Sequence, residues 1–210
     1  MNDDFLVPPK SAKDIEIKAL DWRHAFGVED TWAPDVIDLF EKKLPKLFPN
    51  YTLMVRSDEE MLAIGDAEAY TAFNPSVIAV RNSVYLAASR NEGRARMTFA
   101  HEFGHLVLHP GAAKLRSERA HEIVKRPRPF ESAEWQARKF AAYFLLPDHV
   151  VRQFGTPRDL ADGCHVSIQA AEIRFQEVGH IRRVVPECVS ELIHDINEAA
   201  PRFPKPTLVK

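Results

Sequence analysis

The sequence predicts an α+β fold, in which a small antiparallel or mixed sheet packs on a helix that carries an HExxH motif and the C-terminal half is mostly helical. Short strand-like segments separated by turn residues occupy residues 51–85, and helical spacing of apolar residues dominates after Gly93. The 210 residues, 45% hydrophobic and 28% charged, suffice for one folded core with a small appendage.

Two helices are predicted before the strands. Residues 12–27 place apolar side chains at helical spacing, and residues 33–44 include Pro34, which suits a first helical turn. Strands are predicted where β-branched and aromatic residues gather between turn residues. The predicted strands are 51–56, 67–73 and 77–80, with Ser83 to Tyr85 extending the same sheet.

A long helix is predicted from Gly93 to about Leu108, where the sequence His109-Pro110-Gly111 ends it. The following segment, 110–130, is basic and contains prolines, so we expect a loop, either solvated or acting as a lid or dock for an acidic partner over 112–128. Further helices are predicted over 132–146, 148–153, 157–162, 167–177 and 186–199.

These elements indicate four parts of the chain. A flexible N-terminal arm is expected over 1–12, because Pro8 and Pro9 interrupt any periodicity. A core follows over 13–155, then a helical C-terminal subdomain over 156–200, and then an irregular tail over 201–210 that contains three prolines.

Composition argues against several classes of protein. No apolar run approaches the roughly 20 residues that span a bilayer, and the acidic start MNDDFLVPPK has no apolar core for a secretory signal. Cys164 and Cys188 provide neither a disulfide framework nor a cysteine zinc site, which fits the reducing cytoplasm. The net charge of −2 predicts no general attraction to nucleic acid or membranes. We therefore expect a cytoplasmic protein without a membrane partner.

The chemistry centres on His101-Glu102-Phe103-Gly104-His105, an HExxH sequence inside the predicted long helix. Positions i and i+4 lie on one helical face about 5–6 Å apart, so two imidazoles at this spacing can bind one metal ion. Zinc favours nitrogen ligands in tetrahedral geometry. Glu102 lies about 100° round the helix from His101, where it can act on a water molecule instead of ligating the metal.

The rest of this helix is unlike an ordinary solvated one. No Lys or Arg occurs between positions 97 and 109, and the polar residues form a single stripe. A solvated helix face is rich in charged residues. The stripe consists of Thr98, His101, Glu102, His105 and His109. The alternative interpretation is a set of core histidines satisfied by hydrogen bonds, together with one surface glutamate.

A zinc site needs a third protein ligand, and two residues are candidates. His109 is four positions beyond His105, but a straight helix carries it about 6 Å further along the axis, which favours capping or a contact behind the ligands. Glu134 lies on the packing face of the predicted helix 132–146. A buried carboxylate needs a partner, which a divalent metal supplies. The alternatives for Glu134 are the helix dipole and an ion pair with Arg138.

Three stretches of the sequence carry a resemblance to a known family. They are RARMTFAHEFGHLVLHPG (94–111), EWQARKFAAYFLLP (134–147) and VIAVRNSVYLAASRN (77–91). The first is similar to the active-site helix of the ImmA/IrrE metallopeptidases, the second to that family's second signature, and the third to the strand and tyrosine segment upstream. The likeness is expected to span residues 15–180, which makes 13–155 a metallopeptidase-like core. Arg138 departs from the pattern, which usually has asparagine there.

The resemblance implies a zinc-dependent endopeptidase with a gluzincin-like site and one zinc ion per chain. His101, His105 and Glu134 correspond to the metal ligands of the family, and Glu102 corresponds to the general base. Members often cleave or otherwise relieve transcriptional repressors, so the expected partner is a repressor or another regulator. The small sheet offers an edge strand for an extended substrate. Candidates for groups that surround the ligands or stabilise the oxyanion are His109, Arg138, Tyr85 and Tyr143.

A competing hypothesis comes from residues 156–177, which have helix-turn-helix spacing. The second helix would present Gln169, Glu172, Arg174 and Gln176 to DNA. Between 151 and 183, however, there are five basic and four acidic residues, whereas a DNA-binding face is clearly basic. The alternative function is a non-catalytic regulatory protein that binds a repressor or DNA and has a structural or vestigial metal site.

Overall fold

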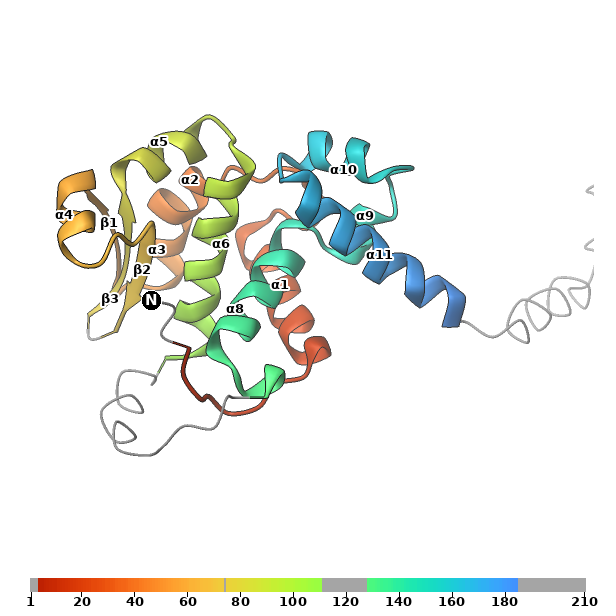
Figure 1. Ribbon diagram of the computed structural model, residues 1–210, viewed down its shortest axis with the longest axis horizontal. Helices are drawn as coiled ribbons and strands as arrows, with labels where there is room; N and C mark the ends of the chain where they lie inside the picture. The colour runs from red at the N-terminus through yellow and green to blue at the C-terminus, as the bar shows by residue number, and fades with distance from the viewer. Residues whose placement is uncertain (1–3, 74, 111–127, 185–210) are drawn as a thin grey trace, which may run out of the picture.

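The computed structural model describes residues 4–73, 75–110 and 128–184, with side chains up to position 179. It confirms the predicted α+β class, because a three-stranded sheet lies at one end of a body built mainly of helices (Figure 1). The predicted helix 186–199, the tail 201–210 and almost all of the basic loop 112–128 lie outside the described residues.

The sheet is mixed, with the strand order β1-β3-β2. β1 (Tyr51–Arg56) runs parallel to the central strand β3 (Ser76–Arg81), and β2 (Ala69–Ala72) pairs with β3 antiparallel. The middle residues of β3, Val77 to Val80, are all buried, as expected for a strand covered on both faces. Within the described part of the chain, β2 therefore pairs with a strand on one side only.

The helices before and beside the sheet differ from the predictions in two places. α1 (Ala12–Phe26) begins as predicted, but the single helix predicted over 33–44 is a succession of short pieces. These pieces are α2 (Val36–Asp38), the π-helical turn η1 (Leu39–Lys43) and α3 (Leu44–Leu47). α4 (Asp58–Ala63) was not predicted, although Ser57 and Glu60 form its capping box.

The strand predicted for Ser83 to Tyr85 is wrong. These residues lie in α5 (Asn82–Ser89), which begins directly after β3 ends. Val84, Tyr85 and Ala88 pack on the core at helical spacing. A window of three residues cannot distinguish this spacing from the alternation of a strand.

The long helix of the motif is α6 (Gly93–Leu108), with the predicted bounds. After residues 111–127 the chain forms a short turn of 3₁₀ helix, η2 (Pro129–Glu131), and then α8 (Ala133–Leu145). Three further helices complete the described chain: α9 (Asp148–Val151), α10 (Pro157–Cys164) and α11 (Ile168–Val184).

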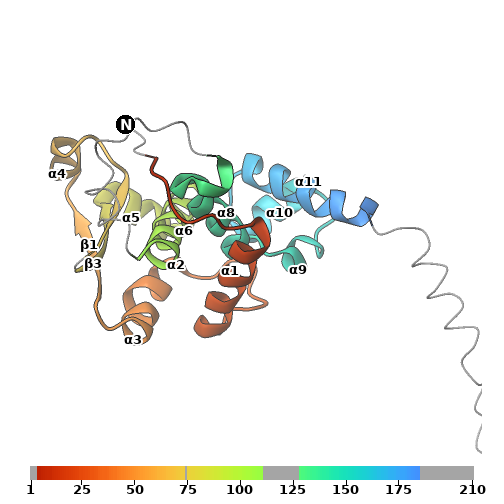
Figure 2. The same ribbon diagram turned by 90° about the horizontal axis from the view of Figure 1, so that it is seen from below.

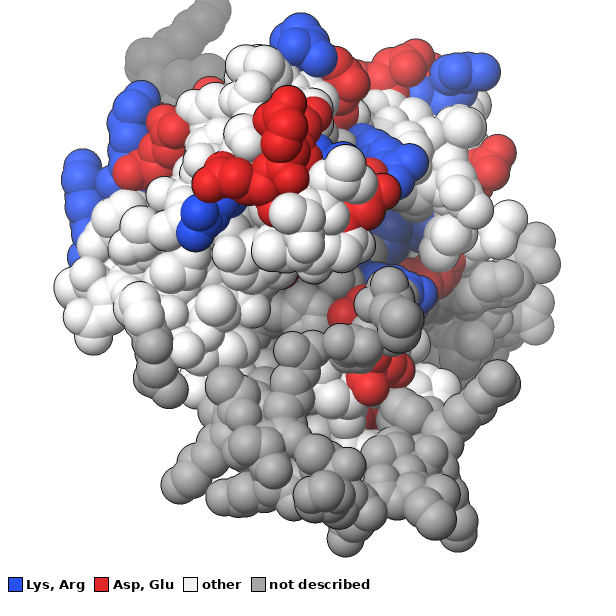
Figure 3. Space-filling view, turned by 60° about the vertical axis from the view of Figure 1, so that its left-hand side comes forward, with Lys and Arg blue, Asp and Glu red and all other residues white. Residues whose placement is uncertain are grey.

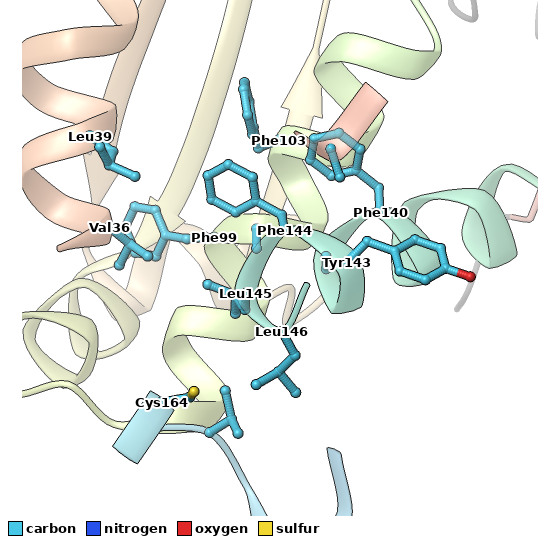
Figure 4. Packing of buried hydrophobic residues seen from close by; sticks show 14 of the residues in the cluster. Val36, Leu39, Phe99, Phe103, Phe140, Tyr143, Phe144, Leu145, Leu146 and Cys164 are labelled. Carbon is cyan, nitrogen blue, oxygen red and sulfur yellow. The ribbon is translucent and has the colours of Figure 1, made fainter. Parts of the chain in front are cut away.

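The core forms around Phe103 on α6, whose ring packs among aromatic side chains from α1, η1 and α8. Figure 4 shows Phe103 with the α8 residues Phe140 and Phe144. The distances from the Phe103 ring centroid are 5.0–5.7 Å to the rings of Trp22, Phe26, Phe40, Phe140 and Phe144. Aromatic pairs in such geometry contribute roughly 0.5–1.5 kcal/mol each beyond the burial of their area. This cluster therefore holds the motif helix against α8.

Gly104 allows α6 and α8 to approach closely. A Cβ atom at this position would lie 3.0 Å from the carbonyl oxygen and 3.1 Å from the Cα atom of Ala137. Side chains rarely tolerate such contacts with backbone, because interiors are already close-packed. The glycine inside the HExxH sequence thus brings the histidine-bearing helix next to the helix that carries Glu134.

We expect Gly104→Val to lower the free energy of unfolding by about 2–3 kcal/mol, because the new side chain would force α8 away from α6. Gly179→Val is the matched control, since Gly179 also lies in a helix but a Cβ atom added there would meet nothing within 4 Å. Replacing glycine by valine changes the intrinsic helix propensity by the same amount at both positions. Urea unfolding measures the difference, and an equal loss at both positions would argue against close packing at Gly104.

Both ends of α8 are fixed. At its C-terminal end, two buried arginines donate to backbone carbonyls: Arg23 to Phe144 (2.7 Å) and Arg174 to Leu146 (3.1 Å). Cationic donors at this end also complement the helix dipole. At the N-terminal end, the Ser132 hydroxyl accepts a hydrogen bond from the N–H of Trp135 (3.0 Å). The helix that carries Glu134 is therefore held at both ends.

The N-terminal arm, residues 4–10, has defined partners, in contrast to the flexible arm predicted over 1–12. Leu6 forms a β-bridge with Ser132, and two further backbone hydrogen bonds join the arm to η2. Figures 1 and 2 both show the arm running beside α8 before α1 begins. Prolines remove backbone donors, but the remaining N–H and carbonyl groups of an extended segment can still pair with neighbouring backbone.

Candidate metal centre

α6 and α8 bring two imidazoles and one carboxylate together. The Nε2 atoms of His101 and His105 lie 3.1 Å apart, and oxygens of Glu134 lie 3.4 Å from the first and 3.2 Å from the second. All three possible ligand atoms lie within 4.8 Å of one another. Of the described residues, no other group of His, Cys, Asp and Glu gathers in this way.

The separations between these atoms fit a metal ion. Bonds of about 2.0–2.1 Å in tetrahedral geometry place the ligand atoms of zinc roughly 3.3 Å apart. Here the two Nε2 atoms are 3.1 Å apart, and each has one Glu134 oxygen at a similar distance: Oε2 lies 3.4 Å from His101 and Oε1 lies 3.2 Å from His105. His105 is buried, whereas His101 and Glu134 are partly exposed, so the cluster is accessible from one side. Two imidazoles and one carboxylate also form a known ligand set of catalytic zinc, in which a fourth position stays open.

Glu134 is ionised by its surroundings. The hydrogen bonds with His101 and then His105 hold the pKa of this carboxyl well below its usual range, despite the opposite effect of burial. A metal-ligating carboxylate must be deprotonated, so this arrangement suits a ligand. Arg138, the alternative partner, lies with Nη2 3.9 Å from Glu134 Oε2 and is mainly exposed. The contacts of Glu134 with the two imidazoles are shorter than its contact with Arg138.

Glu102, the candidate base, is held by a residue that the sequence analysis missed. The hydroxyl of Thr71 on β2 lies 2.7 Å from Glu102 Oε2 and 2.9 Å from the Glu102 carbonyl oxygen. A hydroxyl donates one proton, and a bond to a charged carboxylate is stronger than one to a carbonyl. Thr71 therefore restrains Oε2 and leaves Oε1 of Glu102 available. No sequence signal marked it, because one threonine in a strand forms no motif with a distant helix.

His109 lies behind the ligands, in contact with His105. Gln136 donates its amide protons to the carbonyls of Pro8 and Phe130, so its Oε1 must accept from His109 Nε2, at 3.2 Å. His109 Nδ1 is then an acceptor, and His105 Nδ1–H donates to it across 3.2 Å. If a metal ion replaced the hydrogen bond between His105 Nε2 and Glu134, this order of donors would leave the Nε2 lone pair for the ion, which is the tautomer that a metal ligand requires.

The buried site of His109 predicts a pH dependence of stability in the metal-free protein. Burial, and next the neighbouring His105, lower the pKa of His109 to about 4. In the unfolded chain this imidazole takes up a proton near pH 6.5. The stability contributed by the neutral, buried His109 is therefore complete above that pH, and it is lost as the pH falls toward 4, because protonation then favours the unfolded chain.

We therefore expect wild type to lose about 3 kcal/mol more than His109→Gln between pH 7 and pH 4. His149→Gln, at an exposed histidine, is the control and should follow wild type. Urea unfolding with a chelator present measures these slopes. Parallel profiles for wild type and His109→Gln would contradict the assignment.

Two tyrosines that were candidate oxyanion donors do not reach the cluster. The hydroxyl of Tyr85 donates to Glu41 on η1 (2.7 Å). Tyr143 packs its ring beneath the guanidinium of Arg174, 4.7 Å from the ring centroid. Tyr143 is nine residues beyond Glu134, which puts it about 13 Å along α8 and on the opposite side of the helix. These two predictions are therefore wrong.

A family model matches more than half of the chain. It is described as Peptidase_M78, IrrE N-terminal-like domain, and it matches residues 62–176. The chain belongs to this family. The match includes α6 and α8, and so both the HExxH sequence and Glu134, but it begins later than the likeness predicted over 15–180. Membership of the IrrE N-terminal-like family implies a metallopeptidase and thus a metal ion.

A solved structure of a Mycobacterium tuberculosis transcriptional regulator is similar to this member of the IrrE N-terminal-like family, with a TM-score of 0.51 and 18% sequence identity. The similarity covers 76% of this chain and 45% of that chain, so this chain spans less than half of the regulator's length. At this identity the likeness concerns the fold alone. No curated protein matches the chain.

The structure argues against the helix-turn-helix hypothesis, because the only basic residue of the predicted recognition helix is buried. α10 and α11 do follow one another across a short turn, but Arg174 is only 2% exposed and binds Leu146, Asp148 and Glu177. The prediction that Arg174 faces DNA is therefore wrong. Gln169, Glu172 and Gln176 are exposed but carry no positive charge.

The face on the side of α4 and the sheet is no better suited to DNA, because acidic and basic side chains are neighbours there (Figure 3). The ion pairs of this region are Arg56–Glu60, Arg81–Asp66 and Arg94–Glu68. Nucleic-acid binding requires a continuous basic surface. As for membranes, none of the described helices combines the length and the apolar character needed to cross one.

Proposed function

We propose that this protein is a zinc-dependent endopeptidase that hydrolyses a peptide bond in a protein substrate, namely a transcriptional repressor or regulator. The observation that carries the proposal is the convergence of His101, His105 and Glu134, with the two Nε2 atoms 3.1 Å apart and one Glu134 oxygen within 3.4 Å of each, separations close to those between the ligands of zinc. The choice of a regulator as substrate follows the ImmA/IrrE resemblance.

The three residues would hold zinc, since two imidazoles and a carboxylate favour it over magnesium or calcium, which prefer oxygen ligands. Zinc held there would supply Lewis-acid chemistry, polarising the scissile carbonyl and making a water molecule more acidic. His109 and Gln136 keep His105 in the ligand tautomer, and Arg138 contacts Glu134 from the solvent side.

Glu102 carries the proton in this mechanism. Its Oε1 accepts a proton from the attacking water and then delivers it to the nitrogen of the leaving amine, so one carboxylate acts first as base and then as acid. Thr71 binds Oε2, which fixes the direction of the free oxygen. The proton that Glu102 takes from water is the one that the amine product carries away, so Glu102 is again a carboxylate when the two products separate.

The sheet suggests how a substrate is held. β2 pairs with β3 on one side, and its other edge is unpaired within the described residues. An extended peptide can add to such an edge through backbone hydrogen bonds. Because Thr71 on β2 touches Glu102, a peptide on this edge would pass beside the candidate base. A substrate bound in this way extends on both sides of the cleaved bond, which supports an endopeptidase.

Thr71→Val should lower kcat about 10- to 100-fold, the effect of losing one hydrogen bond to a charged group. Valine keeps the shape of threonine but lacks the hydroxyl. Zinc affinity should not change, because Thr71 contacts Glu102 and not the proposed ligands. Thr71→Ser restores the donor and should recover most of the activity, whereas a serine variant as slow as the valine variant would contradict this role.

The proposed function is tested by elemental analysis of the purified protein and by incubation with transcriptional repressors, beginning with any that is encoded beside its gene. We expect one zinc ion per chain, and new peptide termini in mass spectrometry that disappear with a chelator and return with zinc. A protein that contains no zinc and binds none when it is supplied would exclude this function.

A further inference from the structure

The N-terminal arm is connected to the proposed metal ligands in three ways, two of them direct and one through Gln136 and His109. The first contact is made by Asp4, at the start of α8. Its carboxylate accepts hydrogen bonds from the Ser132 hydroxyl (2.8 Å) and from the backbone N–H of Glu134 (3.2 Å). An acidic group at a helix N-terminus is favourable in itself, and here it holds the backbone of a proposed ligand.

The second contact is made by Phe5. Its ring stacks on the ring of His105, with a centroid distance of 6.4 Å and an interplanar angle of 25°. It also meets the ring of His109 edge-on, at 6.0 Å. The phenylalanine thus covers the side of the two histidines that faces the arm and restricts the rotation of both rings.

The third contact runs through Gln136. Its amide nitrogen donates to the carbonyl of Pro8 (3.0 Å), and its oxygen accepts from His109, which accepts in turn from His105. Gln136 and His109 are both buried. A chain of hydrogen bonds therefore extends from the backbone of the arm to a proposed metal ligand.

These three contacts differ from ordinary packing of a terminal segment, because each ends on His105 or Glu134. Pro8 and Pro9 restrict the backbone of the arm, so little conformational entropy is lost when it docks. Outer partners of metal ligands commonly change metal affinity 10- to 100-fold. The arm contributes such partners to two of the three proposed ligands.

We propose that the N-terminal arm is part of the metal centre: it holds His105 and Glu134 in ligand geometry, so metal binding and docking of the arm strengthen each other. This inference rests on the metal site of the proposed function. By thermodynamic linkage, the factor by which the docked arm raises metal affinity equals the factor by which the metal favours docking.

Zinc affinity of the full-length protein, measured by competition with a chromophoric chelator, tests the first half of this linkage. Asp4→Ala, Phe5→Ala and Gln136→Leu should each weaken zinc binding about 10-fold. Asp35→Ala is the matched control, because the Asp35 carboxylate also accepts hydrogen bonds from backbone N–H groups at a helix N-terminus, that of α2, and its partners there are Ile37 and Asp38. It should destabilise the fold without changing zinc affinity.

Hydrogen exchange of the wild-type protein tests the second half without any substitution. The N–H groups of Val7 and Lys10 are bonded to η2, so their exchange reports docking of the arm. Zinc should slow both about 10-fold or more, whereas the N–H of Met61 on α4, which donates to the carbonyl of Ser57, should not respond. Nitrogen NMR of the zinc-loaded protein should show the His105 proton on Nδ1, and Gln136→Leu should weaken this signature.

The outcomes separate the two proposals. If wild type binds zinc and cleaves its substrate while the arm variants bind zinc as tightly as the control, the inference about the arm is overturned and the proposed function stands. Unchanged exchange at Val7 and Lys10 on adding zinc would overturn it as well. A wild-type protein that binds no zinc would overturn both.

Discussion

Glu102→Gln is expected to reduce peptide hydrolysis by about 10²- to 10⁴-fold, the contribution typical of general acid–base catalysis. Glutamine has nearly the same shape and can still accept a hydrogen bond from Thr71, but it cannot take up a proton from water. Because Glu102 is outside the cluster of possible ligands, zinc content should remain that of wild type. Initial rates of substrate cleavage, together with elemental analysis of the same preparation, measure both effects.

This variant also separates the two functions considered for the chain. A catalytic protein loses its effect on the repressor when Glu102 becomes glutamine, whereas a binding protein with a vestigial metal site retains it. Repressor release should therefore be measured beside cleavage. Equal release by wild type and Glu102→Gln, with no new peptide termini, would reject the peptidase in favour of the regulatory binding protein.

Glu134→Ala is expected to weaken zinc binding by at least about 100-fold, more than the loss of an outer partner of a ligand usually costs. The substitution removes one of three proposed ligands and leaves the two histidines without their carboxylate partner. Activity should fall with zinc occupancy. Glu134→Gln keeps the side-chain size but removes the charge, so it should also bind zinc weakly.

Glu172→Ala provides the control for this experiment, because Glu172 is an exposed glutamate on α11. Chelator competition measures the affinities of all three variants. If Glu134→Ala bound zinc as tightly as Glu172→Ala, the carboxylate of Glu134 would not be a ligand. In that case its contacts with the two histidines would be an ion-pair arrangement of the metal-free protein.

Much of the fold follows from patterns that are local in the sequence. The bounds of α6 were predicted because a long stretch of buried residues ends at His109-Pro110-Gly111. Shorter elements were less predictable. The π-helical turn within 39–43 leaves the apolar pattern of a helix almost unchanged, and three residues of α5 resemble a strand.

The surroundings of the candidate site were less predictable than its centre. Thr71 and Gln136 have no distinctive sequence context, yet one touches Glu102 and the other connects His109 to the N-terminal arm. Tyr85 and Tyr143 have the right chemistry for oxyanion donors but are engaged elsewhere. Residue type indicates what a side chain can do, but only packing determines which neighbour it meets.

By itself, the sequence determined the class of fold, the helix that presents His101, Glu102 and His105, and the resemblance to a metallopeptidase family. These are properties of spacing along a single segment, where helical geometry relates residues four apart. Only the tertiary structure decided that Glu134 meets both histidines, that His109 supports His105 from behind, and that residues 4–10 pack against the cluster. Those contacts join segments far apart in the chain, so they depend on the close approach of α6 and α8 at Gly104 and on the aromatic core around Phe103.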